Sequence, residues 1–420
     1  MAATCEDTLE MPTDTTTKPA LSVEQARERI LSGLRPVDAV ENVKLSAAAG
    51  RILAEDLIAR LPVPAFANSA MDGYALAGRD LPVNGERRLR VIGSSLAGHP
   101  FMGDVGMGAC VRIMTGAMLP SGTDTVVMQE EVRTAGADIV IGVGHRIGEN
   151  VRLPGSDVPT GSRVLEHGRR LRPGDLGVIA SLGLPEVNVR RRVRTAFFST
   201  GDELREPGVK LAPGQIYERN RYTLSATLAG LGADFVDLGV VPDQPEAIRA
   251  AMKSASQADI VLTSGGVSVG DTDYVRQVLA ELGEISFWRV AMKPGKPLAF
   301  GRLGDAWFFG LPGNPVSALV TFQLFVAPAL HALAGESYRE PLTLRAQTLC
   351  AFDKRQGRAE FPRGILSRKD GAWFVGSAGS QDSSALSVMS RADCFVLLPT
   401  EAATIPAGME IEVMPFDVPA

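Results

Sequence analysis

The stretch that decides the fold class is Ile260-Val261-Leu262-Thr263-Ser264-Gly265-Gly266-Val267-Ser268-Val269-Gly270-Asp271-Thr272-Asp273-Tyr274. An apolar run typical of a buried strand leads into a glycine turn, and a helical pattern follows the turn. Glycines after a strand let backbone N–H groups approach an anion, and the N-terminus of the next helix adds about half a positive charge. The residues predicted to hold a phosphate group here are Ser264, Gly265, Gly266 and Ser268.

Two carboxylates in the same turn do not suit a bare phosphate. Asp271 and Asp273 would repel an anion unless a divalent cation lay between them, so their presence favours a metal and phosphate site. The alternative is an ordinary strand-turn-helix connection in which an aspartate caps the helix. A short glycine motif is a weak signal by itself, so the choice depends on the rest of the chain.

Length and composition narrow the function classes. A chain of 420 residues is expected to form several domains, and its net charge of -5 argues against nucleic-acid binding, which needs a basic face. The four cysteines form no Cys-x-x-Cys pair, so neither a zinc site nor a disulfide framework is indicated, and a cytoplasmic location fits. The polar N-terminus is no signal peptide and is predicted to be a disordered leader.

Strand and helix patterns alternate in the second half of the chain, which is typical of a parallel sheet with helices on both faces. The predicted strands are 193–199, 235–240, 259–263, 284–290 and 307–309, and the predicted helices are 220–231, 245–257, 273–282 and 315–333. The last helix contains no charged residue. A membrane span is the alternative there, but polar residues within it favour a buried core helix.

The remaining segments predict further domains. Helices are expected at 21–34, capped by Ser22, at 45–57 and at 172–182, and short alternating runs over 88–143 indicate an inserted β domain. The predicted division is a disordered leader at 1–19, a helical and linker domain at 20–64 with 150–190, an inserted β-rich domain at 65–149, an α/β domain at 191–336, and a C-terminal β domain at 337–420.

Polar loops leave the predicted sheet where its strands end. Ligands bind beyond the carboxyl ends of such strands, so several acidic loops meeting at one edge indicate a magnesium and phosphate site. The acids concerned are Asp202, Glu203, Asp243, Asp271 and Asp273. Lys293 and Lys296 lie on a turn stiffened by prolines and are predicted to hold an oxyanion, the alternative being a solvated basic turn. No Walker P-loop, dinucleotide fingerprint or Ser-His-Asp arrangement is evident.

For two motifs in the first third of the chain, the residues alone do not distinguish an ordinary turn from a functional site. They are the polar turn over residues 68–75, which contains Asp72, and residues 112–117, where a strand ends at Thr115. Taken with 126–130, 199–204, 264–274, 293–297 and 311–317, they closely resemble the molybdopterin molybdenumtransferase family, which includes the C-terminal domain of gephyrin. The resemblance runs from about residue 20 to the end, and several long motifs in one order make it specific.

The resemblance implies a cytoplasmic homodimer of four-domain subunits. Its fold class would be a multidomain α/β protein with a central doubly wound, mostly parallel molybdopterin-binding domain, an inserted β-rich domain and a small C-terminal β-barrel. Adenylated molybdopterin and molybdate would be the substrates, the adenylate would be hydrolysed with Mg²⁺, and molybdenum cofactor and AMP would leave. The molybdopterin adenylyltransferase is a further candidate partner, whereas nucleic acid and membrane are not expected.

The resemblance also assigns roles to individual residues. Asp273, Glu203 and Asp243 would be catalytic, with Asp72 and Thr115 contributed by the partner subunit. Magnesium would be held by Glu203, Asp243, Asp271 and Asp273. Substrate would be bound by Ser264, Gly265, Gly266, Ser268, Asp271, Lys293, Lys296, Pro312, Asn314, Pro315, Arg358 and Ser383. Two departures from the family pattern are Arg289, where lysine is frequent, and Ser156, where glutamate is common; the second leaves the role of Asp157 open.

Two rival hypotheses remain. A scaffold could keep the pterin-binding fold without turnover, although loss of the acidic loops would then be expected. Another nucleotide-processing enzyme, such as an adenylyltransferase or an amidase of nicotinamide nucleotides, could share the α/β fold. The N-terminal motifs and the C-terminal β domain argue against this second rival.

Overall fold

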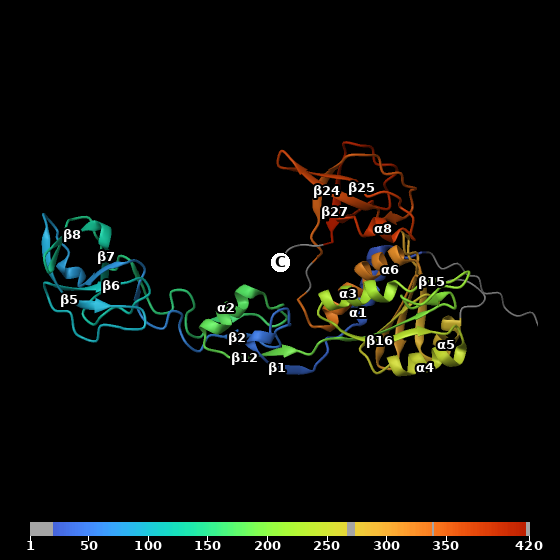
Figure 1. Cartoon of the computed structure of the whole chain (residues 1–420), viewed down its shortest axis with the longest axis horizontal. Coiled ribbons are helices and arrows are strands. Elements are labelled where there is room, and N and C mark those ends of the chain that lie inside the picture. Colours follow the sequence, from blue (N-terminus) through green and yellow to red (C-terminus); the bar gives the residue numbers. More distant parts are fainter. Residues whose placement is uncertain (1–19, 267–273, 338–339, 417–420) are drawn as a thin grey trace, which may run out of the picture. The chain divides into compact units, whose positions relative to one another are not determined.

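A computed structural model describes residues 20–266, 274–337 and 340–416 (Figure 1). These residues form two compact units. The larger takes in the described residues up to 39 together with those from 190 onward, and the smaller spans residues 40–189. The predicted leader at 1–19 and the turn carrying Ser268, Asp271 and Asp273 lie outside the described residues.

A six-stranded sheet forms the centre of the larger unit, with strand order β16-β13-β17-β21-β20-β18. Its parallel strands are β13 (Arg194–Thr200), β16 (Asp234–Val241), β17 (Ile260–Ser264) and β21 (Ala306–Leu311). β20 (Pro297–Leu303) and β18 (Glu284–Arg289) complete one edge in antiparallel pairing. All five predicted strands are therefore confirmed, and β20 is the strand that the sequence pattern did not reveal.

Helices cover both faces of this sheet, as predicted, because successive strand residues point to opposite sides. Phe197 of β13 packs with α1 (Val23–Gly33), α3 (Asn220–Gly230) and the helices after residue 315. Its neighbour Phe198 packs with α4 (Pro245–Ala255) and α5 (Tyr274–Leu282) on the other face. Figure 1 shows α4 and α5 on the side of the sheet opposite to α1, α3 and α6. The doubly wound class is thus confirmed.

The uncharged helix is a core helix. It consists of α6 (Pro315–Thr321), the π-helical segment η4 (Phe322–Val326) and α7 (Ala327–Leu333). Among the described residues it is the one helix with the length and composition of a membrane span, but 78% of its most apolar window is buried inside the protein. This burial agrees with the prediction of a core helix.

The C-terminal part of the larger unit is a closed five-stranded barrel, as the predicted fold class stated. Its strands are β22 (Leu344–Thr348), β25 (Ala372–Ser377), β24 (Arg363–Lys369), β26 (Cys394–Val396) and β27 (Glu410–Pro415). Val375, Val396 and Val413 fill the interior. A short helix, α8 (Leu386–Met389), follows the segment that carries Ser383.

The smaller unit contains a six-stranded, mainly antiparallel sheet that fits the expected inserted β region. In spatial order its strands are β7 (Thr125–Met128), β4 (Gly73–Leu76), β6 (Ala109–Ile113), β5 (Arg87–Ser95), β9 (Asp138–Ile141) and β8 (Val132–Ala135). Three two-stranded pairs accompany it: β1 (Val40–Lys44) with β12 (Glu186–Arg190), β2 (Leu57–Ile58) with β11 (Arg163–Leu165), and β3 (Asn68–Ser69) with β10 (Val151–Arg152). The predicted helix at 172–182 is α2 (Pro173–Ser181).

The predicted helix at 45–57 is wrong. One 3₁₀ turn, η1 (Leu45–Ala47), forms there, and Gly50 then adopts a left-handed φ of +72° that ends any helical path. Leu53 and Ile52 make isolated β-bridges to later segments, and Leu53 is buried in the small core around α2. The apolar residues that suggested one face of a helix instead belong to an extended segment, where they pack into this core.

Candidate functional site

The candidate site begins where three neighbouring parallel strands end. Ser199 of β13 pairs with Ser264 of β17, which pairs with Leu311 of β21. The loops after these strands therefore leave the sheet at one edge, as the strand-end argument predicted.

A cavity of about 340 Å³ lies at this edge. It includes four predicted site residues, Glu203, Ser264, Gly265 and Asn314. Thr200, Leu204 and Gly313 also line it and lie within the predicted motifs 199–204 and 311–317. The remaining lining residues, which the sequence did not single out as site residues, are Ile216, Tyr217, Glu218, Arg219 and Asn220. Two strands, β14 (Leu204–Arg205) and β15 (Ile216–Tyr217), contribute to its rim.

Both described glycines of the phosphate cradle are required by the backbone. Gly265 has φ +94°, and a Cβ there would lie 2.8 Å from the carbonyl oxygen of Thr200. Gly266 has φ +65°, and its Cβ would lie 2.3 Å from Cγ2 of Val275 on α5. Other residues could adopt this turn only with strain and displacement of neighbours. The turn thus keeps the backbone close to the cavity.

Asn220 ties two of the loops together. Its Nδ2 donates to Oγ of Ser264 at 2.6 Å and to the carbonyl oxygen of Gly313 at 2.8 Å, and the residue is almost fully buried. Its Oδ1 has no hydrogen-bond partner among the described residues. Next to it, the buried Glu218 accepts from the backbone N–H of Arg221. Sequence reasoning used Asn220 only as the start of a helix, although a polar residue beginning a buried helix face was an available signal.

Acidic side chains from two loops meet beside this cavity. The backbone N–H of Asp243 donates to Oδ1 of Asp202 at 3.3 Å. Burial raises the pKa of the Asp243 carboxyl, and the nearby charges of Asp202 and Glu203 raise it further. Three of the five predicted acids are therefore close enough to act on one another. Asp271 and Asp273, the other two, lie outside the described residues.

The predicted cations are organised by a residue that the sequence did not indicate, Glu360. Its side chain is 6% exposed, with Oε1 2.9 Å from Nε of Arg358 and Oε2 3.8 Å from Nζ of Lys293. The contact arises because β19 (Met292–Lys293) pairs in parallel with β23 (Ala359–Glu360). Glu360 thereby fixes two of the predicted anion-binding cations, which come from distant parts of the chain.

The turn that carries both lysines is fixed by close packing. Gly295 has φ +98°, and a Cβ there would lie 2.5 Å from Oγ1 of Thr321 on α6. The backbone N–H of Val290 donates to the carbonyl oxygen of Lys296 at 2.8 Å, while the residues Lys293 and Lys296 are exposed. The turn is rigid and its charged ends remain available.

The loop between β21 and α6 brings in Ser383. Nδ2 of Asn314 donates to Oγ of Ser383 at 3.1 Å, and the N–H of Val316 donates to the Ser383 carbonyl oxygen at 3.1 Å. Pro312 precedes these contacts, and Pro315 occupies the first turn of α6, where a missing N–H costs nothing. Ser383 of the C-terminal part thus lies beside Asn314, one of the cavity residues.

Asp72 and Thr115, in the smaller unit, form a contact of their own. Oδ1 of Asp72 accepts from the Thr115 backbone N–H at 2.8 Å and from its hydroxyl at 2.7 Å. These two hydrogen bonds, the backbone one first, lower the pKa of the Asp72 carboxyl because both stabilise the charged form. The two motifs that the sequence left undecided are therefore one local structure.

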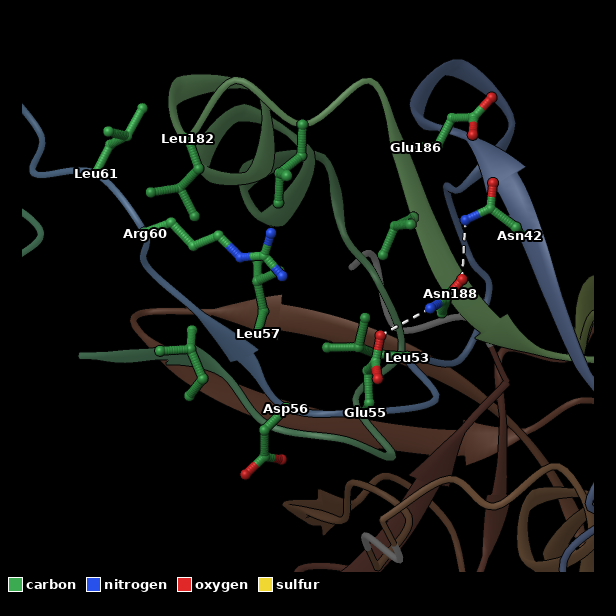
Figure 2. Close-up of a pocket in the computed structure, with 13 residues that line it drawn as sticks. Asn42, Leu53, Glu55, Asp56, Leu57, Arg60, Leu61, Leu182, Glu186 and Asn188 are labelled. Carbon is green, nitrogen blue, oxygen red and sulfur yellow. Dashed lines mark hydrogen bonds between the residues drawn. The ribbon is translucent and has the colours of Figure 1, made fainter. Parts of the chain in front are cut away.

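A larger cavity, of about 420 Å³, lies within the smaller unit and contains none of the predicted site residues. Figure 2 shows Asn188 between Asn42 and Glu55 on its wall. Nδ2 of Asn42 donates to Oδ1 of Asn188, and Nδ2 of Asn188 donates to Oε1 of Glu55, both at 2.8 Å. These polar groups satisfy one another, and size alone does not make this cavity the candidate site.

The α/β domain, with acids and a glycine cradle at its strand ends, coincides with a segment that matches a molybdopterin-binding domain, which places the chain in that class of protein. Family descriptions match along the chain: "MoeA N-terminal region (domain I and II)" at 21–183, "Probable molybdopterin binding domain" at 196–332, and "MoeA C-terminal region (domain IV)" at 345–416.

Relatives of known name agree with these matches. A molybdopterin molybdenumtransferase of Haemophilus influenzae is 43% identical over 94% of this chain and 99% of its own. One of Nostoc is 37% identical over 90% and 89%. A solved molybdopterin biosynthesis protein of Pyrococcus horikoshii superposes with a TM-score of 0.84, at 26% identity, over 95% of this chain and 100% of that one. The chain belongs to the molybdopterin molybdenumtransferase family, so the predicted family and enzyme class are confirmed.

Proposed function

We propose that the protein inserts molybdenum from molybdate into adenylated molybdopterin, hydrolysing the adenylate with Mg²⁺ and releasing molybdenum cofactor and AMP. The observation that carries this proposal is the meeting of Asp202, Glu203 and Asp243 beside the cavity that contains Ser264 and Gly265. Acids beside an anion cradle suit the cleavage of a phosphoanhydride that is bound with a metal ion.

The donors present fit magnesium. Mg²⁺ prefers oxygen ligands and retains several waters, and every acid at this edge offers carboxylate oxygens. We propose Glu203, Asp243, Asp271 and Asp273 as its ligands, with Asp273 the leading catalytic candidate. When bound, the ion would neutralise charge on the phosphate oxygens. The backbone of Gly265 and Gly266, with Ser264 and Ser268, would orient the phosphates; Pro312, Asn314 and Pro315 would form the opposite wall.

Molybdate, a tetrahedral dianion, needs fixed cations and hydroxyl donors. We propose Lys293, Lys296, Arg358 and Ser383 for this role. Glu360 supports it, because its carboxylate contacts both Arg358 and Lys293 while the two cationic side chains remain partly exposed.

Asp72 and Thr115 would come from a second copy of the chain in a homodimer, which completes the site. We further propose the four-domain division predicted from the sequence and a cytoplasmic location. Docking of the molybdopterin adenylyltransferase is also proposed. All three rest on the membership of the chain in this family.

The test is AMP release by the purified protein supplied with adenylated molybdopterin, molybdate and Mg²⁺. Asp243→Asn is expected to lower the rate at least about 100-fold, since losing ~3 kcal/mol of transition-state stabilisation has that effect. Asp234→Asn is the matched control, because Asp234 begins the same strand, β16, at the end away from the cavity.

The control variant should retain the wild-type rate. Bound adenylate with no AMP released by wild-type protein would contradict the proposal and favour the scaffold hypothesis. Equal rates for Asp243→Asn and wild type would contradict the assigned role of the acids.

A further inference from the structure

A second group of metal-ligating side chains lies in the smaller unit and is not used by the proposed reaction. Glu131 ends η3 (Gln129–Glu131), and His145 and Glu149 lie on the loop between β9 and β10. One ligand atom from each side chain lies within 4.8 Å of the other two. Imidazole nitrogen and carboxylate oxygen are both ligands that Zn²⁺ and other transition metals accept.

The donor atoms of this group lie within ion-pair range but farther apart than those of a hydrogen-bonded pair. Nδ1 of His145 is 3.4 Å from Oε2 of Glu149 and 3.8 Å from Oε2 of Glu131. By contrast, Nδ1 of His167 is 2.8 Å from its carboxylate partner, Asp56. Two ligands that each lie about 2.1 Å from a tetrahedral ion are about 3.4 Å apart. The atoms around His145 are separated as ligands of one ion are, and more widely than hydrogen-bonded groups.

The loop that supplies two of the three ligands is held before any ion binds. The N–H of Val126 on β7 donates to the carbonyl oxygen of Glu149 at 3.0 Å, and the N–H of Gly148 donates to Oγ1 of Thr125 at 3.1 Å. The N–H of Arg146 donates to Oε2 of Glu149 at 3.0 Å, which orients that carboxylate. The His145 side chain is only 11% exposed. Preformed ligands lose little freedom on binding, which favours affinity.

We propose that Glu131, His145 and Glu149 bind a divalent transition-metal ion such as Zn²⁺. The nitrogen donor favours Zn²⁺ over Mg²⁺ or Ca²⁺, and three protein ligands leave a further position for water. The ion would join the loop before β10 to η3. Gln129, at the start of η3, donates its N–H to the carbonyl oxygen of Asp72 at 3.1 Å, so the joined region includes the support of the Asp72 turn.

The experiment uses the full chain, stripped of metal and kept in excess Mg²⁺ so that oxygen-only sites are filled. Zn²⁺ is titrated in competition with a chromophoric chelator. Wild type is expected to bind one Zn²⁺ per chain at this site, and His145→Ala and the isosteric Glu149→Gln should each weaken that binding at least about tenfold. His99→Ala is the matched control, since His99 is an exposed histidine in a turn after β5 of the same sheet.

A second measurement separates ligand loss from misfolding. Co²⁺ in place of Zn²⁺ should give a visible absorption band in wild type and His99→Ala that is absent from Glu149→Gln, while circular dichroism shows all three proteins folded. The proposal is overturned if wild type binds no equimolar Zn²⁺, if the His145 and Glu149 variants bind it like wild type, or if His99→Ala removes it equally.

Discussion

Replacing Gly265 by alanine should damage the larger unit far more than the same change at Gly313, although the two glycines line the same cavity. At Gly265 the new Cβ would lie 2.8 Å from the Thr200 carbonyl oxygen, on a backbone with φ +94°. At Gly313 the nearest atom is the Cα of Gly265, 3.8 Å from the new Cβ, and φ is outside the left-handed region. The pair therefore isolates the backbone requirement of the cradle.

The expected loss of stability in Gly265→Ala is the sum of two free-energy costs. A side chain on such a backbone costs about 1–3 kcal/mol, and relieving the short contact with Thr200 adds about 1 kcal/mol or more. The sum is about 2–4 kcal/mol, which in a domain of roughly 150–250 residues lowers the melting temperature by about 4–16 °C. Gly313→Ala should stay within about 2 °C of wild type, since ordinary contact adds no strain.

Tryptophan fluorescence during heating measures this effect selectively. The three tryptophans, Trp288, Trp307 and Trp373, all belong to the larger unit, so the signal is insensitive to unfolding of residues 40–189. AMP release should fall with Gly265→Ala and persist with Gly313→Ala. A Gly265→Ala protein that melts with wild type, or a Gly313→Ala protein that melts as early, would refute the reasoning.

Two further predictions concern the dimer and the thiols. If Asp72 serves the other subunit's site, purified mixed dimers of Asp72→Ala and Asp243→Asn chains should recover about half of the wild-type rate of AMP release, because one of two sites is complete; recovery of none would exclude a shared site. Burial raises the pKa of Cys110 and Cys394 from 9.0 to about 12, so peptide-resolved mass spectrometry at about pH 8 should find both unalkylated and the partly exposed Cys350 modified. Thiols of the unfolded chain ionise at a lower pH than the buried thiols, so the free energy of unfolding should fall as the pH rises from 9.0 to about 12. Rapid alkylation of Cys110 in the native protein would contradict its burial.

The parallel core was predictable because its strands carry apolar runs with clear ends. Residues 259–263 predicted β17 to within a residue, and the polar loop after it followed directly. Strand β20 was missed for a physical reason: Pro297 and Gly301 are turn signals in an isolated sequence. In the folded chain a Cβ at Gly301 would lie 2.1 Å from the carbonyl oxygen of Glu284, so the glycine allows close strand pairing instead.

Among the residues at the candidate site, the sequence could likewise predict some and not others. The positions of Glu203 and Ser264 at the cavity could be predicted, because Ser264 ends a strand, Glu203 lies in a loop that follows one, and such strand ends meet at the same sheet edge. Glu360 and Asn220 could not, since their importance lies in partners that only the fold supplies. Glu360 contacts Lys293 through the pairing of β19 with β23, and Asn220 bonds to Ser264 across 44 residues. Burial of a polar side chain marks both, and burial is not visible in the sequence.

The contact between Asp72 and Thr115 could have been predicted if strand β4 had been recognised in the sequence. β4 and β6 are antiparallel, with Gly73 opposite Ile113, so the residue before β4 and the residues after β6 lie at the same end of the pair. Had residues 73–76 been predicted as a strand beside 109–113, the proximity of Asp72 and Thr115 would have followed from register alone. The run Gly-Tyr-Ala-Leu gave no alternation because all four residues are buried. A strand buried on both faces thus conceals the register that brings two functional candidates together.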